Sequence, residues 1–286
     1  MVAYFRPTTL DEALALKAAR PLAILAGGTD IYPARTTRAA WGSMRHADVL
    51  DITAIPTLRG ITEQEAGWRI GALATWSDLV RAPLPPLFDG LKAAARDVGG
   101  VQIQNRGTLA GNICNASPAA DGVPPLLTLD AEVEITSTVG TRRVSLVQFI
   151  DGYRHTVLRP DEIATAILVP RANGNGNFLK LGARRYLVIS IALVAGTLDL
   201  DDTGRIRSAR LAVGACSAVA QRLHALEADL AGHTPADAAA LVRADHLAHL
   251  SPIDDVRATG DFRAHAALTL MRDLVASFTA SRLRAA

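Results

Sequence analysis

The sequence predicts an α+β protein that is built from several compact units. Alternating apolar residues at Ala131, Val133 and Ile135 are typical of a half-buried strand. Apolar residues from Leu87 to Val98 recur at helical spacing. Beyond residue 178, predicted strands precede predicted helices without regular alternation, which favours α+β over a parallel α/β sheet. At 286 residues, the chain is also long for a single core.

The first unit, residues 1–55, is predicted to hold one helix and two short strands. Thr9 and Glu12 form the signature of a capping box, so a helix is expected to begin there. Short apolar runs at residues 22–26 and 48–52 predict the two strands. We therefore expect a small lobe that combines a helix with a sheet.

The second unit, residues 56–172, is predicted to be richer in strands. Strands are expected at residues 68–74, 131–136, 147–153 and 162–169. Residues 101–121 have no clean period and are rich in Asn, Gly, Ser and Pro, so an irregular loop is expected. Loops of this length are uncommon in compact domains unless they bind something.

The third unit, residues 178–286, follows a run of breakers at residues 173–177. Its predicted strands cover residues 178–181, 190–200 and 206–213. Three helices are expected after them, and the last one should present an apolar side to the sheet.

Composition excludes several classes of protein. The net charge is +2, from 30 basic and 28 acidic residues, and aromatic residues make up only 5%. This composition argues against a nucleic-acid-binding surface. The N-terminal residues lack the apolar core of a secretory signal, and the longest apolar stretch is too short to span a bilayer. A cytoplasmic location is therefore predicted.

The first informative segment runs through eight consecutive residues: Ile24, Leu25, Ala26, Gly27, Gly28, Thr29, Asp30 and Ile31. A glycine pair after a strand lets backbone amides turn outward and form a concavity that suits a pyrophosphate. Turn chemistry alone also demands glycine, so the pair is ambiguous by itself. The segment matches neither the G-x-G-x-x-G nor the G-x-x-x-x-G-K-[ST] fingerprint.

The second informative segment lies between Gly107 and Asp121. Its small residues would let the chain pass close to a bulky ligand, and Asp121 offers a carboxylate acceptor. Hydrogen-bonding side chains are expected from Thr108, Asn112, Asn115 and Ser117. A plain polar loop is the alternative interpretation. Binding would require this segment and the first one to converge on a single ligand.

Other candidate residues are weaker. His246 and His249 have a spacing that can bind metal, but a solvated helix face explains them better. Cys114 suits either redox chemistry or a small buried thiol. With only two cysteines, the chain has too few thiolates for its own iron–sulfur cluster. We predict no metal site and no catalytic residue.

Four segments carry a resemblance to a known family. LAGGTDI, IQNRGTLAGNICNASPAAD, GYRHTVLRPDEI and FLKLGARRYLVISIALVA resemble, in order and spacing, the flavoprotein subunits of the xanthine dehydrogenase and carbon monoxide dehydrogenase family of molybdenum hydroxylases. The resemblance implies a two-lobed FAD-binding domain of the p-cresol methylhydroxylase type, followed by a small α+β C-terminal domain.

The resemblance also implies which residues contact FAD. Residues 24–31 match the pyrophosphate and ribityl region, and Lys180 matches a lysine near the flavin. The matching residues of the second segment are Thr108, Leu109, Ala110, Gly111, Asn112, Ser117 and Asp121. Ala110 replaces the first glycine of the usual Gly-Gly-Asn, and Ser190 stands where many members have Asp. Ala164 falls where a larger aliphatic residue is usual, so its role is open.

The function that the resemblance implies is electron transfer through FAD. A large partner subunit would carry the molybdenum cofactor, and a small one would carry two [2Fe–2S] clusters. The acceptor could be NAD, oxygen or another carrier. The substrate stays open among purines, other N-heteroaromatics, aldehydes and carbon monoxide. The alternatives are a self-sufficient FAD-dependent oxidase of the same fold superfamily and a non-catalytic scaffold.

Overall fold

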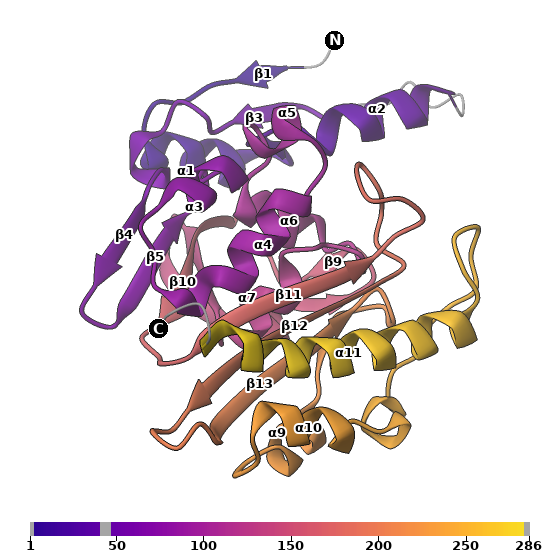
Figure 1. Ribbon diagram of the computed structural model, residues 1–286. Coiled ribbons are helices and arrows are strands. Elements are labelled where there is room, and N and C mark those ends of the chain that lie inside the picture. The colour runs from indigo at the N-terminus through magenta and orange to yellow at the C-terminus, as the bar shows by residue number, and fades with distance from the viewer. Residues whose placement is uncertain (1–2, 41–46, 283–286) are drawn as a thin grey trace.

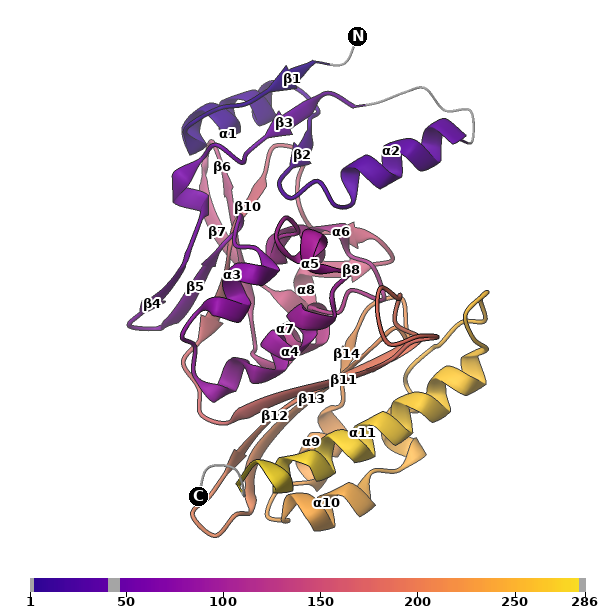
Figure 2. The ribbon, with the colours of Figure 1, turned by 45° about the horizontal axis from the view of Figure 1, so that its top comes forward.

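The computed structural model describes residues 3–40 and 47–282 and contains three main sheets stacked along the molecule (Figure 1). Figure 2 shows the N-terminal sheet at one end, the C-terminal sheet at the other, and the largest sheet between them. The predicted α+β class is confirmed. No described helix is long and apolar enough to cross a membrane.

The N-terminal sheet is parallel, with strand order β1-β3-β2. Its strands are β1 (Tyr4–Phe5), β2 (Ala23–Leu25) and β3 (Val49–Asp51), and its helices are α1 (Leu10–Ala19) and α2 (Ile31–Ala40). Thr9 caps α1 by accepting from the Glu12 amide at 3.3 Å. The Glu12 carboxylate accepts from the amide of Thr8 rather than that of Thr9. Helix α2 begins at Ile31, the last residue of the first glycine segment, and the sequence patterns did not predict it.

The middle sheet is antiparallel, with strand order β4-β5-β10-β6-β7. Its strands are β4 (Ile61–Gln64), β5 (Gly67–Gly71), β6 (Glu132–Ser137), β7 (Gly140–Ser145) and β10 (Ile163–Pro170). Val133 and Ile135 of β6 are buried while their neighbours are half-buried, so the predicted alternation is confirmed. The core of this region includes Trp68, whose ring packs edge-on against the ring of Phe88 with 5.1 Å between the ring centroids.

Most of the helices of the middle region lie between β5 and β6. They are α3 (Trp76–Arg81), α4 (Asp89–Asp97), α5 (Val101–Gln104), α6 (Leu109–Asn115) and α7 (Val123–Thr128). The prediction of an irregular loop at residues 101–121 was therefore wrong. Short helices with caps and small residues fill it, and their apolar period is too brief to detect in sequence. The strand predicted at 147–153 is instead α8 (Leu146–Phe149) followed by β8 (Ile150–Gly152), which pairs with β9 (His155–Thr156).

The C-terminal sheet is antiparallel, with strand order β11-β12-β13-β14. Its strands are β11 (Asn175–Leu181), β12 (Ala192–Leu200), β13 (Ile206–Gly214) and β14 (Gln221–Arg222), and its helices are α9 (His224–Asp229), α10 (Pro235–Leu241) and α11 (Gly260–Arg282). Helix α11 lies across the sheet and buries Met271, Leu274 and Val275. Gly90 of α4 lets the middle region approach β11, since a Cβ there would lie 2.8 Å from the Asn177 carbonyl oxygen.

Candidate functional site

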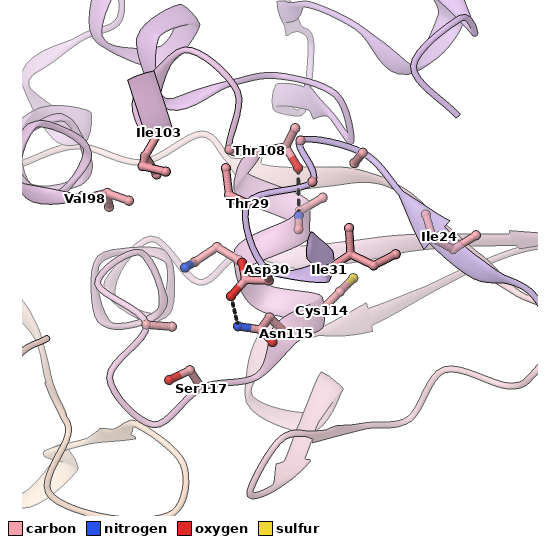
Figure 3. A pocket seen from close by; sticks show the side chains of 18 of the residues that line it. Ile24, Thr29, Asp30, Ile31, Val98, Ile103, Thr108, Cys114, Asn115 and Ser117 are labelled. Carbon is pink, nitrogen blue, oxygen red and sulfur yellow. Dashed lines mark hydrogen bonds between the residues drawn. The ribbon is translucent and has the colours of Figure 1, made fainter. Parts of the chain in front are cut away.

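A cavity of about 780 Å³ lies where the N-terminal sheet meets the helices of the middle region (Figure 3). Such a volume is within the range of cofactor sites. The β2–α2 loop, helix α6 and the β8–β9 turn contribute to its polar part. Apolar side chains of Val98 and Ile103 face it from the opposite side in Figure 3.

The first glycine segment forms the β2–α2 loop, and both of its glycines are structurally required. Gly28 has a φ of +77°, which side-chain-bearing residues rarely adopt. At Gly27, a Cβ would lie 2.1 Å from the Arg106 carbonyl oxygen, so the loop packs directly onto the chain that leads into α6. The two segments that sequence reasoning expected to converge are therefore in contact.

The backbone of this loop offers free hydrogen-bond donors. Within the described chain, the amides of residues 27–30 donate to no protein atom. Hydrogen bonding of α2 starts with the amide of Tyr32, which donates to the Gly28 carbonyl at 3.3 Å. A concave run of unpaired amides beside a cavity is a favourable environment for a phosphate or pyrophosphate.

Helix α6 presents the second segment to the cavity. Thr108 caps it by accepting from the Gly111 amide at 3.0 Å, so its hydroxyl is used within the protein. The side-chain oxygen of Asn112 is buried and, among described residues, has no hydrogen-bond partner. Because an unpaired buried polar atom is costly, this oxygen suits a ligand group that donates a hydrogen bond, whereas the free amides suit an acceptor such as a phosphate.

A chain of hydrogen bonds joins the three segments of the polar part of the cavity. The side-chain amide nitrogen of Asn115 donates to the Asp30 carboxylate at 2.8 Å, and the Arg154 guanidinium donates to the side-chain oxygen of Asn115 at 2.8 Å. Asp30 comes from the β2–α2 loop, Asn115 from the end of α6, and Arg154 from the β8–β9 turn (Figure 3 shows the Asp30–Asn115 contact). All three residues line the cavity.

Asp121 forms a buried polar cluster at another wall of the cavity. Its carboxylate accepts from the Lys180 ammonium at 2.8 Å and from the Ser190 hydroxyl at 2.5 Å. Burial raises the pKa of Asp121, and the charge of Lys180 and the two hydrogen bonds oppose that rise. Ser190 thus supplies a donor where a second carboxylate would repel Asp121.

Lys180 points into this cluster and not into the cavity. Its ammonium also approaches the carbonyl oxygens of Asp97 at 3.2 Å and of Val188 at 3.5 Å. With three acceptors around it, the ammonium has its donors occupied by the protein. Its influence on a cavity ligand would therefore pass through Asp121.

Most of the predicted cofactor-binding residues line the cavity. They are Ile24, Ala26, Gly27, Gly28, Thr29, Asp30, Ile31, Thr108, Ala110, Gly111, Asn112, Ser117 and Asp121. Leu25, Leu109 and Lys180 do not line it. The side chains of Leu25 and Leu109 are buried on other sides of β2 and α6. Contact with FAD itself stays a prediction for every member of this set.

Sequence reasoning missed the apolar part of the lining. Val98, Ile103 and residues 187–189 line the cavity, but Val98 was predicted to lie in a core helix, Ile103 in the irregular loop, and residues 187–189 in no helix or strand. Ala164 lines it too and is buried. No local motif marks these residues, because apolar side chains at helical or strand spacing suit a core equally well.

The weaker candidates have structural explanations. Cys114 is a free thiol on the cavity wall, and burial raises its pKa to about 12, so it stays protonated. His246 is buried and contacts the Asp229 carboxylate at 3.0 Å, so the solvated face predicted for it is wrong. Residues 3–40 and 47–282 contain no group of three or more His, Cys, Asp or Glu that could hold a metal.

Comparisons with known proteins agree with the cavity. Residues 1–172 match the family described as "FAD binding domain in molybdopterin dehydrogenase", and residues 177–278 match "CO dehydrogenase flavoprotein C-terminal domain". The chain is 32% identical to the putative xanthine dehydrogenase FAD-binding subunit of Escherichia coli, over 97% of this chain and 96% of that protein. It is 37% identical to the nicotinate dehydrogenase FAD subunit of Eubacterium barkeri, over 70% of each.

The fold is likewise that of a solved structure. A chain of carbon monoxide dehydrogenase from Hydrogenophaga pseudoflava superimposes with a TM-score of 0.85 and 26% identity, covering 95% of both chains.

Proposed function

Because this chain belongs to the family of FAD-binding subunits of xanthine dehydrogenase-type molybdenum hydroxylases, we propose that it is the electron-transfer subunit of a heteromeric enzyme. In this role it passes electrons from iron–sulfur clusters of a partner to an external acceptor. The observation that carries the proposal is the cavity itself, which is lined both by the β2–α2 loop with its unpaired amides and by helix α6.

The residues of the chain would divide the work of holding FAD. The amides of the β2–α2 loop would receive the pyrophosphate and ribityl region, and the start of α6, with Ala110 in place of the usual glycine, would flank the second phosphate. Asn112, Ser117 and Asp121 would supply polar contacts, with Lys180 and Ser190 holding the Asp121 carboxylate. Val98 and Ile103 would cover an apolar ring.

The protein contributes binding, orientation and electrostatics. Bound FAD would supply the redox chemistry, because its ring system can accept and release electrons. No side chain of the cavity needs to act as acid, base or nucleophile in this role. The free amides and the dipoles around Asp121 would set the affinity for FAD and tune its electronics.

The proposed partners are a large subunit with the molybdenum cofactor and a small subunit with two [2Fe–2S] clusters. The names of the relatives, which call them FAD subunits, support an assembly of this kind. The acceptor would be NAD, oxygen or another carrier, and we propose a cytoplasmic enzyme. The substrate would be chosen by the large subunit.

The decisive experiment compares the chain alone with the assembled enzyme. We expect the purified chain to bind FAD, to contain no stoichiometric iron or molybdenum, and to be reducible by dithionite. It should not reduce a dye with xanthine, nicotinate, an aldehyde or carbon monoxide as donor.

Adding the large and small partners should create substrate-to-dye activity, and the same partners with FAD-depleted chain should show less transfer to the acceptor. Substrate oxidation by the lone chain would overturn the proposal and favour a self-sufficient FAD-dependent oxidase.

A further inference from the structure

We propose that Arg263, in the C-terminal helix α11, is a positioning residue for the FAD cavity. It acts through the backbone next to Ser190 and through the segment that carries Asp121. This inference rests on the proposed function, because it assumes that the wall around Asp121 faces FAD.

The guanidinium of Arg263 is buried, with 3% of the residue exposed. Nη1 donates to the carbonyl oxygens of Ile191 at 2.6 Å and Ala215 at 3.4 Å, and Nη2 donates to the Asp255 carboxylate at 2.6 Å. A buried charge is costly unless it is paired and hydrogen-bonded. The Arg263 side chain therefore holds the backbone just before β12 and just after β13.

Both held segments continue directly to the cavity wall. Ile191 follows Ser190, whose hydroxyl donates to the Asp121 carboxylate at 2.5 Å. The Ala215 amide donates to the Pro118 carbonyl at 2.9 Å, and Pro118 lies between the lining residues Ser117 and Asp121. Two separate lines of contact therefore connect one guanidinium to the same short wall.

Anchoring α11 to the sheet does not require a buried arginine at position 263. The helix is anchored to the sheet by apolar side chains, including Met271 and Leu274, which are fully buried. Arg272 provides a matched comparison on the same helix, because its Nε donates to the Val242 carbonyl at 3.0 Å, in the part of the C-terminal domain formed by α10. The two residues differ in that the backbone acceptors of Arg263 belong to segments that contact the cavity wall, whereas the acceptor of Arg272 does not.

The test is a double-mutant cycle on FAD affinity. Arg263→Met and Ser190→Ala should each raise the FAD Kd about tenfold, since each disturbs a buried hydrogen bond that orders the Asp121 wall. The double variant should bind clearly more tightly than the product of the two effects predicts, because both changes act on one network. Arg272→Met should lower the melting temperature but leave the Kd unchanged.

Several outcomes would overturn the inference. An unchanged Kd in Arg263→Met would do so, as would strictly multiplicative effects in the double variant, which would mean that the two residues act independently. If Arg263→Met does not fold by circular dichroism, Arg263→Lys replaces it in the same cycle. Asp121→Ala separates the two proposals: if its Kd is also unchanged, the FAD site itself is misplaced, and the proposed function fails first.

Discussion

Replacing Gly28 with alanine tests the proposed FAD-binding role of the β2–α2 loop most directly. Gly28 has a φ of +77°, and an added Cβ would lie 2.8 Å from the Tyr32 ring. Tyr32 is 54% exposed, so its ring can move aside, and the backbone conformation is the main obstacle. A left-handed conformation costs a residue with a Cβ about 1–2 kcal/mol.

We expect most of this cost to appear in binding. In the variant without a ligand we expect the loop to shift toward a negative φ, whereas the amides of residues 27–30 must keep their arrangement to hold a pyrophosphate. A penalty of about 1–2 kcal/mol corresponds to an affinity loss of roughly 5- to 30-fold. Gly28→Val should lose more, because a β-branched side chain tolerates positive φ least.

Gly60→Ala is the matched control for this change. Gly60 has a similar φ of +85°, has no atom within 4 Å of an added Cβ, and does not line the cavity. It should lower the free energy of unfolding by about 1–2 kcal/mol and leave the FAD Kd unchanged. Fluorescence titration with FAD and urea unfolding of the FAD-free protein measure the two quantities. Equal Kd values for wild type, Gly28→Ala and Gly60→Ala would refute the assignment of the loop.

Two further predictions concern pH and the FAD linkage. The backbone amide of Arg257, together with the Arg263 and Arg257 side chains, lowers the pKa of Asp255 to about 2 against the effect of burial. The ionised carboxylate therefore stabilises the folded protein above its ordinary pKa of 3.8, and this stabilisation is lost as the pH falls toward 2. Urea unfolding from pH 5 to pH 2 should therefore show Asp255→Asn less stable than wild type at pH 5 and nearly equal to it at pH 2; a constant difference would contradict the assigned pKa. Cys114 lines the cavity as a protonated thiol, and we expect FAD to be held non-covalently. Acid precipitation should release it into the supernatant, and flavin retained in the pellet would show a covalent link.

Local signals predicted those elements that local interactions determine. The Thr9 cap at α1 occurs where the sequence places it, because a cap satisfies amides within one turn. The alternation in β6 also survives folding. By contrast, α2 and α5–α7 were missed. Their short helices depend on packing against neighbouring segments more than on an apolar period.

The candidate site shows the same division. The glycines, Thr108, Asn112 and Asp121 were identified from sequence because their residue types and order are distinctive. The orientation of Lys180 was not, because only the fold brings its ammonium within 2.8 Å of Asp121, 59 positions earlier in the chain. Arg263 gave no signal at all, since its acceptors come from the ends of two strands.

The sequence by itself determined the class of fold, the two segments that line the cavity and the family to which the chain belongs. These depend on residue identity over short distances, where glycine conformations, caps and strand alternation are set by neighbours along the chain. Tertiary structure alone decided which side chains share the cavity: Asp30 with Asn115 and Arg154, and Asp121 with Lys180 and Ser190. Such contacts join residues far apart in sequence, and they exist only because packing of three sheets and their helices brings those segments together.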